Sequence, residues 1–387
     1  MLDLLVVGAG PAGSAAAIVA RLAGLQVGLL DDANEQQLKV GESLPGAAVR
    51  LLRRLGLAGP GDLLRPHEFE PCVANASAWG DEHWTYRDAL GNPEGGGWHI
   101  LRHRFDARLR DRAEALGATR IHARLGDAHS LGSPWRISIP GGDGPHELHA
   151  RFVIDATGRR AAFSKKQGVS RRRLSNQFAV VAWLRHPEGD RDRTTRVKSV
   201  SNGWWYTARL PGALRVLAFH GLPRTVTQLA RQPAAFAEHC NRSGLLPYAV
   251  EERDLGEALR VSDAAVRCAE HTSGRSWLAV GDAALSFDPL ASQGILFALY
   301  SGIRGAETAI QCLASAQLAP RHLGEYDRKV YEVLFANQRA RRLFYTSERR
   351  YLDDPYWENQ QRFANSALQS DSDVAVTPAN DANSARP

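Results

Sequence analysis

Three glycines near the start of the chain have the spacing that lets a protein backbone approach phosphate groups. Gly8, Gly10 and Gly13 follow a short apolar run and precede an alanine-rich segment. In a strand–turn–helix unit, the first such glycine permits the tight turn, the second admits a pyrophosphate, and the third lets the helix pack on the sheet. The helix N-terminus adds a partial positive charge. The spacing therefore predicts binding of a dinucleotide.

An acidic residue completes this first motif. Asp31 lies 18 residues beyond Gly13, directly after a second apolar run. A carboxylate at this place accepts hydrogen bonds from a ribose diol, whereas an arginine would accommodate a 2′-phosphate. The acid favours an unphosphorylated ribose, as in FAD or NAD.

A second motif lies some 270 residues later and favours FAD. Gly281-Asp282 ends a short apolar run, and a long apolar segment begins near Ser292. Asp282 is placed to bind a ribityl hydroxyl. The N-terminus of a helix beside the N1–C2=O edge of a flavin stabilises the negative charge that develops there on reduction. An N-capped core helix alone would explain the helix but not the preceding Gly-Asp.

Strands and helices that position these motifs follow from hydrophobic periodicity and capping signals. In the nucleotide-binding part the sequence predicts strands at Leu2–Val7, Gln26–Leu30, Phe152–Ile154 and Trp277–Val280, and helices at 46–57, 105–117 and 292–312. A second sheet is predicted over 176–262, where Trp204–Leu210 and Leu214–Phe219 flank Pro211-Gly212 as a hairpin.

The resulting fold class is α/β. It consists of a discontinuous Rossmann-like FAD-binding domain, an inserted antiparallel-sheet substrate domain and a helical C-terminal region. The expected boundaries are 1–65, 100–165 and 265–312 for the FAD domain, 66–99 and 176–262 for the substrate domain, 313–365 for the helices, and 366–387 for a disordered tail poor in apolar residues.

Composition excludes several classes of protein. The chain has 387 residues, of which 44% are hydrophobic, enough for a large core. No apolar run reaches the ~20 residues of a membrane-spanning helix. Four widely spaced cysteines indicate a reduced, cytoplasmic protein without a metal site.

Charge is distributed unevenly along the chain. The net charge is +6, while residues 151–200 hold 13 basic and 4 acidic residues, a local +9. This distribution argues against a nucleic-acid coat, because the rest of the chain is slightly acidic. Two interpretations of the basic stretch 165–198 stay open, a solvated loop and a surface that steers an acidic partner.

Together the motifs resemble the FAD-dependent monooxygenase superfamily, which includes aromatic hydroxylases and flavin-dependent tryptophan halogenases. The resemblance covers most of residues 1–360 and is carried by Val7–Gly13, Asp155–Arg159 and Gly281–Gly294. Further segments resemble the halogenase-like branch, and within it the maturation flavoproteins that hydroxylate a tryptophan inside a partner protein on the way to tryptophylquinone. These segments are Lys39–Pro45, Gly203–Tyr206 and Glu348–Arg350.

The resemblance implies an FAD monooxygenase that hydroxylates an aromatic ring through a flavin C4a-hydroperoxide formed with O2. The implied substrate is a tryptophan of the precursor of a quinone-cofactor enzyme subunit. The alternative is a flavin-dependent hydroxylase or tryptophan-type halogenase that acts on a free small molecule. The reductant is NAD(P)H or a separate flavin reductase, because a second Gly-x-Gly-x-x-Gly motif is missing from the sequence.

Two departures from the halogenase pattern matter. The halogenases carry Trp-x-Trp-x-Ile-Pro, whereas this chain has Trp204-Trp205-Tyr206 followed by Leu210-Pro211. Their catalytic lysine has no secure counterpart, since Lys39 lies in the flavin-contact segment and Lys165 in a basic loop. These departures favour hydroxylation.

Candidate site residues follow from the motifs and the resemblance. Arg102 has three open roles: contact with the pyrophosphate, closure of the flavin site, or a surface ion pair. The candidate cofactor contacts are Gly8, Gly10, Pro11, Ala12, Gly13, Asp31, Ser43, Arg102, Gly281, Asp282, Pro289, Gly294 and Ile295. No catalytic residue is assigned, and the candidates for lining the substrate site are Trp204, Trp205, Tyr206 and Gln293.

Overall fold

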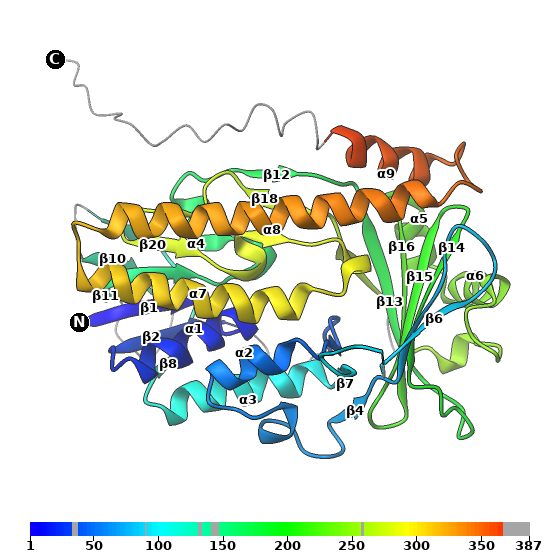
Figure 1. Ribbon diagram of the computed structural model, residues 1–387, viewed down its shortest axis with the longest axis horizontal. Helices are drawn as coiled ribbons and strands as arrows, with labels where there is room; N and C mark the ends of the chain where they lie inside the picture. The colour runs from blue at the N-terminus through cyan, green and yellow to red at the C-terminus, as the bar shows by residue number, and fades with distance from the viewer. Residues whose placement is uncertain (33–37, 90, 131–133, 141–146, 257–258, 367–387) are drawn as a thin grey trace.

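The computed structural model describes residues 1–32, 38–89, 91–130, 134–140, 147–256 and 259–366 (Figure 1). Its nucleotide-binding half is built on five parallel strands in the order β20-β11-β1-β2-β8. Their bounds are β1 (Leu2–Val7), β2 (Val27–Asp31), β8 (Thr119–His122), β11 (Glu147–Asp155) and β20 (Trp277–Ala279). The antiparallel strands β9 (Ala128–His129), β10 (Trp135–Ser138) and β19 (Ser273–Gly274) complete this sheet. The predicted α/β class is confirmed.

Helices pack closely around this sheet. The principal ones are α1 (Pro11–Leu22), α2 (Ala48–Arg54), α3 (Arg102–Ala115) and α7 (Gly294–Ala314). A Cβ added to Gly302 of α7 would stand 2.2 Å from the carbonyl oxygen of Ala12, so α7 lies directly on α1. The predicted start of α7 near Ser292 is two residues early, because Ser292 has a left-handed backbone with φ 48°. Helix α3 begins three residues before its predicted start, at Arg102.

A second sheet of seven strands stands beside the first, in the order β17-β13-β16-β15-β14-β5-β6. Its pairs are antiparallel except for β14 and β5, which are parallel. The bounds are β5 (Ala74–Ala78), β6 (Thr85–Asp88), β13 (Phe178–Arg185), β14 (Thr194–Val200), β15 (Gly203–Leu210), β16 (Leu214–Gly221) and β17 (Arg260–Asp263). The predicted hairpin around Pro211-Gly212 is present as β15 and β16.

The stretch 176–262 is not all sheet, contrary to the sequence prediction. It includes α5 (Pro223–Ala230) and α6 (Pro233–Ser243), each with a proline in its first turn, where the missing N–H costs no helical hydrogen bond. These two helices cover one face of the sheet. The stretch 66–99 is also divided, since β7 (Trp98–Ile100) pairs with both β3 (Ser43–Leu44) and β4 (Phe69–Pro71) in a separate three-stranded sheet.

Short elements and the C-terminal helices connect the two halves. The strands β12 (Arg171–Arg173), β18 (Arg267–Ala269) and β21 (Leu285–Ser286) form a small sheet, and α4 (Ala162–Lys166) follows the Rossmann strand β11. Helix α8 (Ala319–Ser347) runs along the nucleotide half and reaches the second sheet, where α9 (Pro355–Ser366) follows (Figure 1). The predicted tail lies, from residue 367 onward, outside the described residues. Among the helices described, none combines the length and the apolar character needed to cross a bilayer.

Candidate flavin and substrate site

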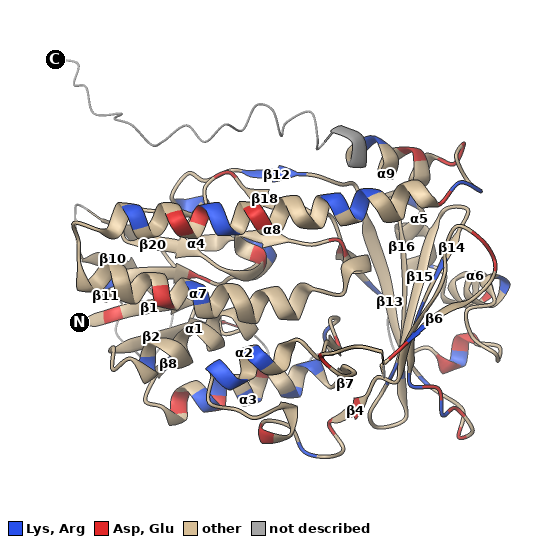
Figure 2. Cartoon of the chain, in the orientation of Figure 1, with Lys and Arg blue, Asp and Glu red and all other residues tan. Residues whose placement is uncertain are grey.

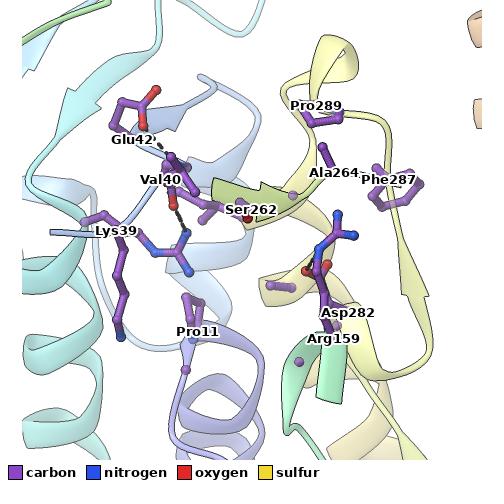
Figure 3. Close-up of a pocket in the computed structure, with 18 of the residues that line it drawn as sticks. Pro11, Lys39, Val40, Glu42, Arg159, Ser262, Ala264, Asp282, Phe287 and Pro289 are labelled. Carbon is purple, nitrogen blue, oxygen red and sulfur yellow. Dashed lines mark hydrogen bonds and ion pairs between the residues drawn. The ribbon is translucent and has the colours of Figure 1, made fainter. Parts of the chain in front are cut away.

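A cavity of about 430 Å³ extends from the N-terminus of α1 to the second sheet. Figure 3 shows Pro11 at the start of α1, with Lys39 and Glu42 on one side and Arg159 and Asp282 on the other. Parallel strands of an open α/β sheet bind ligands beyond their carboxyl ends, and the cavity lies at such an edge.

The three glycines of the first motif have different surroundings. A Cβ on Gly8, which has φ +100°, would stand 2.4 Å from the carbonyl oxygen of Ala156. A Cβ on Gly13 would stand 1.8 Å from the carbonyl oxygen of Gly8. By contrast, a Cβ on Gly10 would meet nothing within 4 Å, and Gly10 lines the cavity. Two glycines therefore serve packing, and Gly10 leaves room for a ligand.

Asp31 has an open hydrogen-bonding position that fits a ribose. The residue ends β2, is 6% exposed, and its buried Oδ2 has no hydrogen-bond partner among the described residues. A second cavity of about 350 Å³ lies beside it, next to Arg160 and Asp32. Arg160 is already bound in bidentate fashion to Asp32 at 2.8 and 3.1 Å, and these hydrogen bonds lower the pKa of Asp32. These features match the ribose end of FAD.

Two arginines contact Asp282 in the Gly281-Asp282 motif. The Nε of Arg159 lies 3.5 Å from Oδ2 of Asp282, and Arg171 donates a hydrogen bond of 2.6 Å to the Asp282 carbonyl. Helix α7 begins beside this motif at Gly294, preceded by Gln293, and both residues line the cavity. The free N–H groups of the first turn of α7 thus meet the cavity, as a flavin N1–C2=O edge requires.

A buried ion pair anchors the loop that carries Pro289. The carboxylate of Asp288 accepts hydrogen bonds from the backbone N–H of Leu290 at 3.1 Å and from Nε of Arg341 at 3.0 Å. The Tyr345 hydroxyl donates a third, at 3.0 Å. The side chains of Asp288 and Arg341 are each 2% exposed. Removing one partner would leave the other charge buried and unpaired, so α8 holds this loop in place.

Arg102 lines the cavity but its charge is already paired. Its Nε donates a 2.7 Å hydrogen bond to Asp106, one helical turn along α3. Its guanidinium also donates hydrogen bonds to the carbonyls of Val40 and Gly41 at 3.2 and 3.3 Å. Arg102 thus forms an ion pair with Asp106 and also bonds the segment around Val40 in the cavity wall, and its contact with a cofactor stays a prediction.

One face of the second sheet forms the end of the cavity farthest from Asp31. Side chains in a strand alternate between the two faces, so Trp204 and Tyr206 of β15 line the cavity whereas Trp205 does not. Trp205 instead packs against α6, where its ring centroid lies 5.0 Å from that of Phe236. Trp205 is therefore removed from the substrate-site candidates, because the predicted run of three aromatics ignored this alternation.

A buried carboxyl group lies at the same end of the cavity. Burial raises the pKa of Glu42, and burial together with Glu42 raises the pKa of Tyr206 well above its ordinary value. The Tyr206 hydroxyl lies 3.0 Å from Oγ of Ser43. The Tyr206 and Ser43 hydroxyl groups thus lie beside the apolar wall as hydrogen-bonding groups.

The cavity brings together nearly all of the residues singled out from the sequence. Lining it are Gly8, Gly10, Pro11, Ala12, Asp31, Ser43, Arg102, Trp204, Tyr206, Gly281, Asp282, Pro289, Gln293, Gly294 and Ile295. Gly13 and Trp205 do not line it. Lining residues that the sequence analysis did not assign include Glu42, Arg159, His220 and Asp288. Glu42, Arg159 and Asp288 lie inside the segments Lys39–Pro45, Asp155–Arg159 and Gly281–Gly294, whereas His220 directly follows the predicted strand Leu214–Phe219.

Comparison with known proteins places the chain in a family. Residues 85–380 match the family model described as tryptophan halogenase. LodB of Marinomonas mediterranea, whose name describes an FAD-dependent oxidoreductase, is 25% identical over 387 residues, covering 95% of this chain and 98% of LodB. A 1H-pyrrole-2-carbonyl-[peptidyl-carrier protein] brominase of Pseudoalteromonas luteoviolacea is 24% identical over 343 residues, covering 80% of this chain and 78% of that enzyme.

Solved structures share the fold. The flavin-dependent halogenase CmlS superposes with a TM-score of 0.81 at 21% identity, covering 95% of this chain and 69% of CmlS. The peptidyl tryptophan dihydroxylase QhpG, described as essential for tryptophylquinone cofactor biogenesis, superposes with a TM-score of 0.76 at 23% identity, covering 93% of this chain and 78% of QhpG. The chain thus belongs to the tryptophan halogenase family and is an FAD-dependent oxidoreductase.

Proposed function

We propose that this protein is a monooxygenase that hydroxylates the ring of a tryptophan in a partner protein, during maturation of a quinone-cofactor enzyme. The observation that carries the proposal is the placement of the lysines. All five lie in the described part of the chain, and Lys39 alone lines the cavity. Its Nζ is 3.3 Å from Oδ2 of Asp106, close to the α3 wall. No free lysine therefore stands at the sheet end, where a halogenase would need one.

The comparisons support this choice without deciding it. QhpG acts, by its description, on a peptidyl tryptophan, and LodB matches this chain over nearly its whole length. We propose the same class of substrate here, a tryptophan held in a precursor polypeptide.

Residues of the chain would prepare the site for a planar, electron-rich ring. Bound FAD, once reduced, supplies the activation of O2. The proposed flavin contacts are those named above, from Gly8 to Ile295. The sheet face beyond them is apolar, the first turn of α7 offers N–H groups to developing negative charge, and the Tyr206 hydroxyl supplies a hydrogen-bonding group beside the ring. The reductant is proposed to be NAD(P)H or a separate flavin reductase.

The basic stretch 165–198 does not gather into one docking surface. Several of its cations form ion pairs within the chain: Lys166 with Asp127, Arg193 with Glu70, Lys198 with Glu82, and Arg196 with Asp192. The stretch also runs from α4 and β12 over the nucleotide half to β14 in the second sheet (Figure 2). Charge alone therefore no longer argues for an acidic partner at this stretch.

A second candidate is halogenation or hydroxylation of a free small molecule. The match to the halogenase family model favours it, as do relatives such as the brominase and a tryptophan 2-halogenase of Chondromyces crocatus, which is 24% identical over 347 residues, 85% of this chain and 65% of that enzyme.

The deciding experiment supplies the FAD-loaded enzyme with a reductant, O2 and a candidate unmodified precursor polypeptide. The intact mass of the precursor should rise by whole oxygen atoms, and peptide mapping should place them on tryptophan. A parallel arm offers free tryptophan with chloride or bromide. Halogenated tryptophan, together with an unchanged precursor, would replace the proposal by the second candidate. Reactions with NAD(P)H alone and with an added flavin reductase identify the reductant.

A further inference from the structure

At the sheet end of the cavity, two buried rings lie flat against each other. Trp204 of β15 and His220 of β16 are directly opposite across the hairpin. Their ring centroids are 3.7 Å apart and the rings are within 6° of parallel. Trp204 is fully buried, His220 is 4% exposed, and both line the cavity. The stacking fixes the orientation of the imidazole.

The imidazole of His220 has an unused hydrogen-bonding capacity. Its Nδ1 is buried and makes no hydrogen bond of normal geometry with a described residue. The nearby Trp204 backbone favours the protonated form slightly, but burial dominates and lowers the pKa of His220 to about 3. At neutral pH the ring is therefore uncharged, with one nitrogen protonated and the other an acceptor.

The surroundings of His220 suit a flat apolar ring. Ala179 and Val181 of β13 and Val216 and Ala218 of β16 lie on the same sheet face and line the cavity, as alternation in the strands requires. These side chains are small or aliphatic, and the imidazole edge of His220 lies among them. A planar heterocycle with a single N–H donor would match this surface.

We propose that the unprotonated ring nitrogen of His220 accepts a hydrogen bond from the indole N–H of the substrate, so that His220 positions the ring and selects indole over analogues that lack the N–H. This inference rests on the proposed function, from which it takes the substrate class, an indole. It applies equally to a tryptophan in a polypeptide and to a free indole, because both present the same N–H.

The test uses the oxidised, FAD-loaded protein and two probes of nearly the same shape. N-acetyl-L-tryptophanamide carries the indole N–H, and the corresponding N-acetyl amide of 3-benzothienylalanine has sulfur in its place. Calorimetry and the perturbation of the flavin spectrum measure both dissociation constants. The wild-type protein should bind the indole about tenfold more tightly, the value of one hydrogen bond.

Two variants separate this role from a structural one. His220→Phe keeps a ring stacked on Trp204 but removes the acceptor, so the preference for indole should fall to about onefold. His239→Phe, on the other face of the sheet, serves as a matched control and should keep the preference. Flavin content reports whether each variant retains its fold.

Several results would overturn the inference. They are equal binding of the two probes to the wild type, an undiminished indole preference in His220→Phe, and no indole binding at the limit of probe solubility. The precursor assay described above is independent of these results. An unmodified precursor together with a clear indole preference would reject the protein substrate and keep the role of His220, whereas a hydroxylated precursor with no indole preference would do the reverse.

Discussion

The two faces of the seven-stranded sheet carry the same pair of residue types in different states. On the face covered by α6, Trp205 donates from Nε1 to Nδ1 of His239 at 3.1 Å, and Nε2 of His239 lies 3.1 Å from Oδ1 of Asn202. On the cavity face, Trp204 and His220 stack, and His220 makes no hydrogen bond of normal geometry to a described residue. The hydrogen bonds of Trp205 and His239 are thus satisfied within the protein, whereas His220 keeps an acceptor that a ligand could use.

This contrast helps to separate structural from ligand-binding residues in the same strand. Both tryptophans are fully buried, so burial alone does not distinguish them. What distinguishes them is whether the polar atoms beside them are satisfied by the protein, since an unpaired buried group is costly and persists where a ligand or water completes it. The same criterion identifies Asp31, whose Oδ2 has no described partner.

The largest effect is expected at two glycines, because Gly13 is packed against the protein whereas Gly10 faces the cavity. In Gly13→Val the new Cβ would lie 1.8 Å from the carbonyl oxygen of Gly8, and the rest of the side chain adds to this clash. The variant should therefore fail to fold. Gly10→Val meets open space at its Cβ, with φ −73° at this residue, so it should fold but retain no FAD. Circular dichroism reports the fold, and absorbance of the purified protein reports the flavin. A folded Gly10→Val protein with full flavin content would show that the pyrophosphate lies elsewhere.

The next largest effect is a difference in stability between variants on the two faces of the seven-stranded sheet. Trp205→Ala removes a large side chain from the packed face and should lower the free energy of unfolding by about 3–5 kcal/mol. Tyr206→Phe, its neighbour on the cavity face, removes only the hydroxyl that contacts Ser43 and should cost no more than about 1.5 kcal/mol. Denaturant titration of the two variants beside wild type measures both changes. Similar losses in the two would contradict the assignment of the faces.

Much of the nucleotide site was predictable because its constraints are local. Glycine spacing, an acid after the next strand and a Gly-Asp before a long helix each need only a short stretch of chain, and most of these residues line one cavity. The substrate end was harder, since it depends on which strand face meets the cavity. In the hairpin that forms, strand alternation puts Trp204 and Trp205 on opposite faces, and Trp204 lies opposite His220, one residue beyond the predicted strand Leu214–Phe219.

Other features depend on contacts between distant segments. The parallel pairing of β5 with β14 and the ion pair between Asp288 and Arg341 join residues far apart in sequence, so no local pattern signals them. Helices α5 and α6 were within reach of prediction, because each begins with a proline that marks a helix start.

A smaller effect should appear when each histidine is replaced. His239→Phe leaves the buried Nε1 of Trp205 without its acceptor and should cost about 1–3 kcal/mol. His220→Phe deprives no described group of a hydrogen bond and should cost less than the His239 variant. Thermal or denaturant unfolding of the flavin-free proteins makes this comparison without a contribution from the cofactor. The reverse order of stabilities would mean that His220, and not His239, completes the structure.

The smallest expected effect is a difference in pH dependence. Burial lowers the pKa of His220 to about 3 in the folded protein, whereas a free histidine side chain has a pKa of 6.5, so below pH 6.5 the unfolded chain binds a proton that the folded protein does not. The free energy of unfolding therefore decreases on acidification, and the contribution of His220 lost between pH 6.5 and 5 is about 1.5 kcal/mol. His220→Phe lacks this contribution and should lose that much less stability over the same interval. Carboxyl groups such as Glu348, whose pKa is lowered to about 2, lose most of their contribution at lower pH and are common to both proteins. Equal slopes for wild type and variant would mean that His220 takes up a proton in the folded state, which would remove the neutral acceptor from the cavity face.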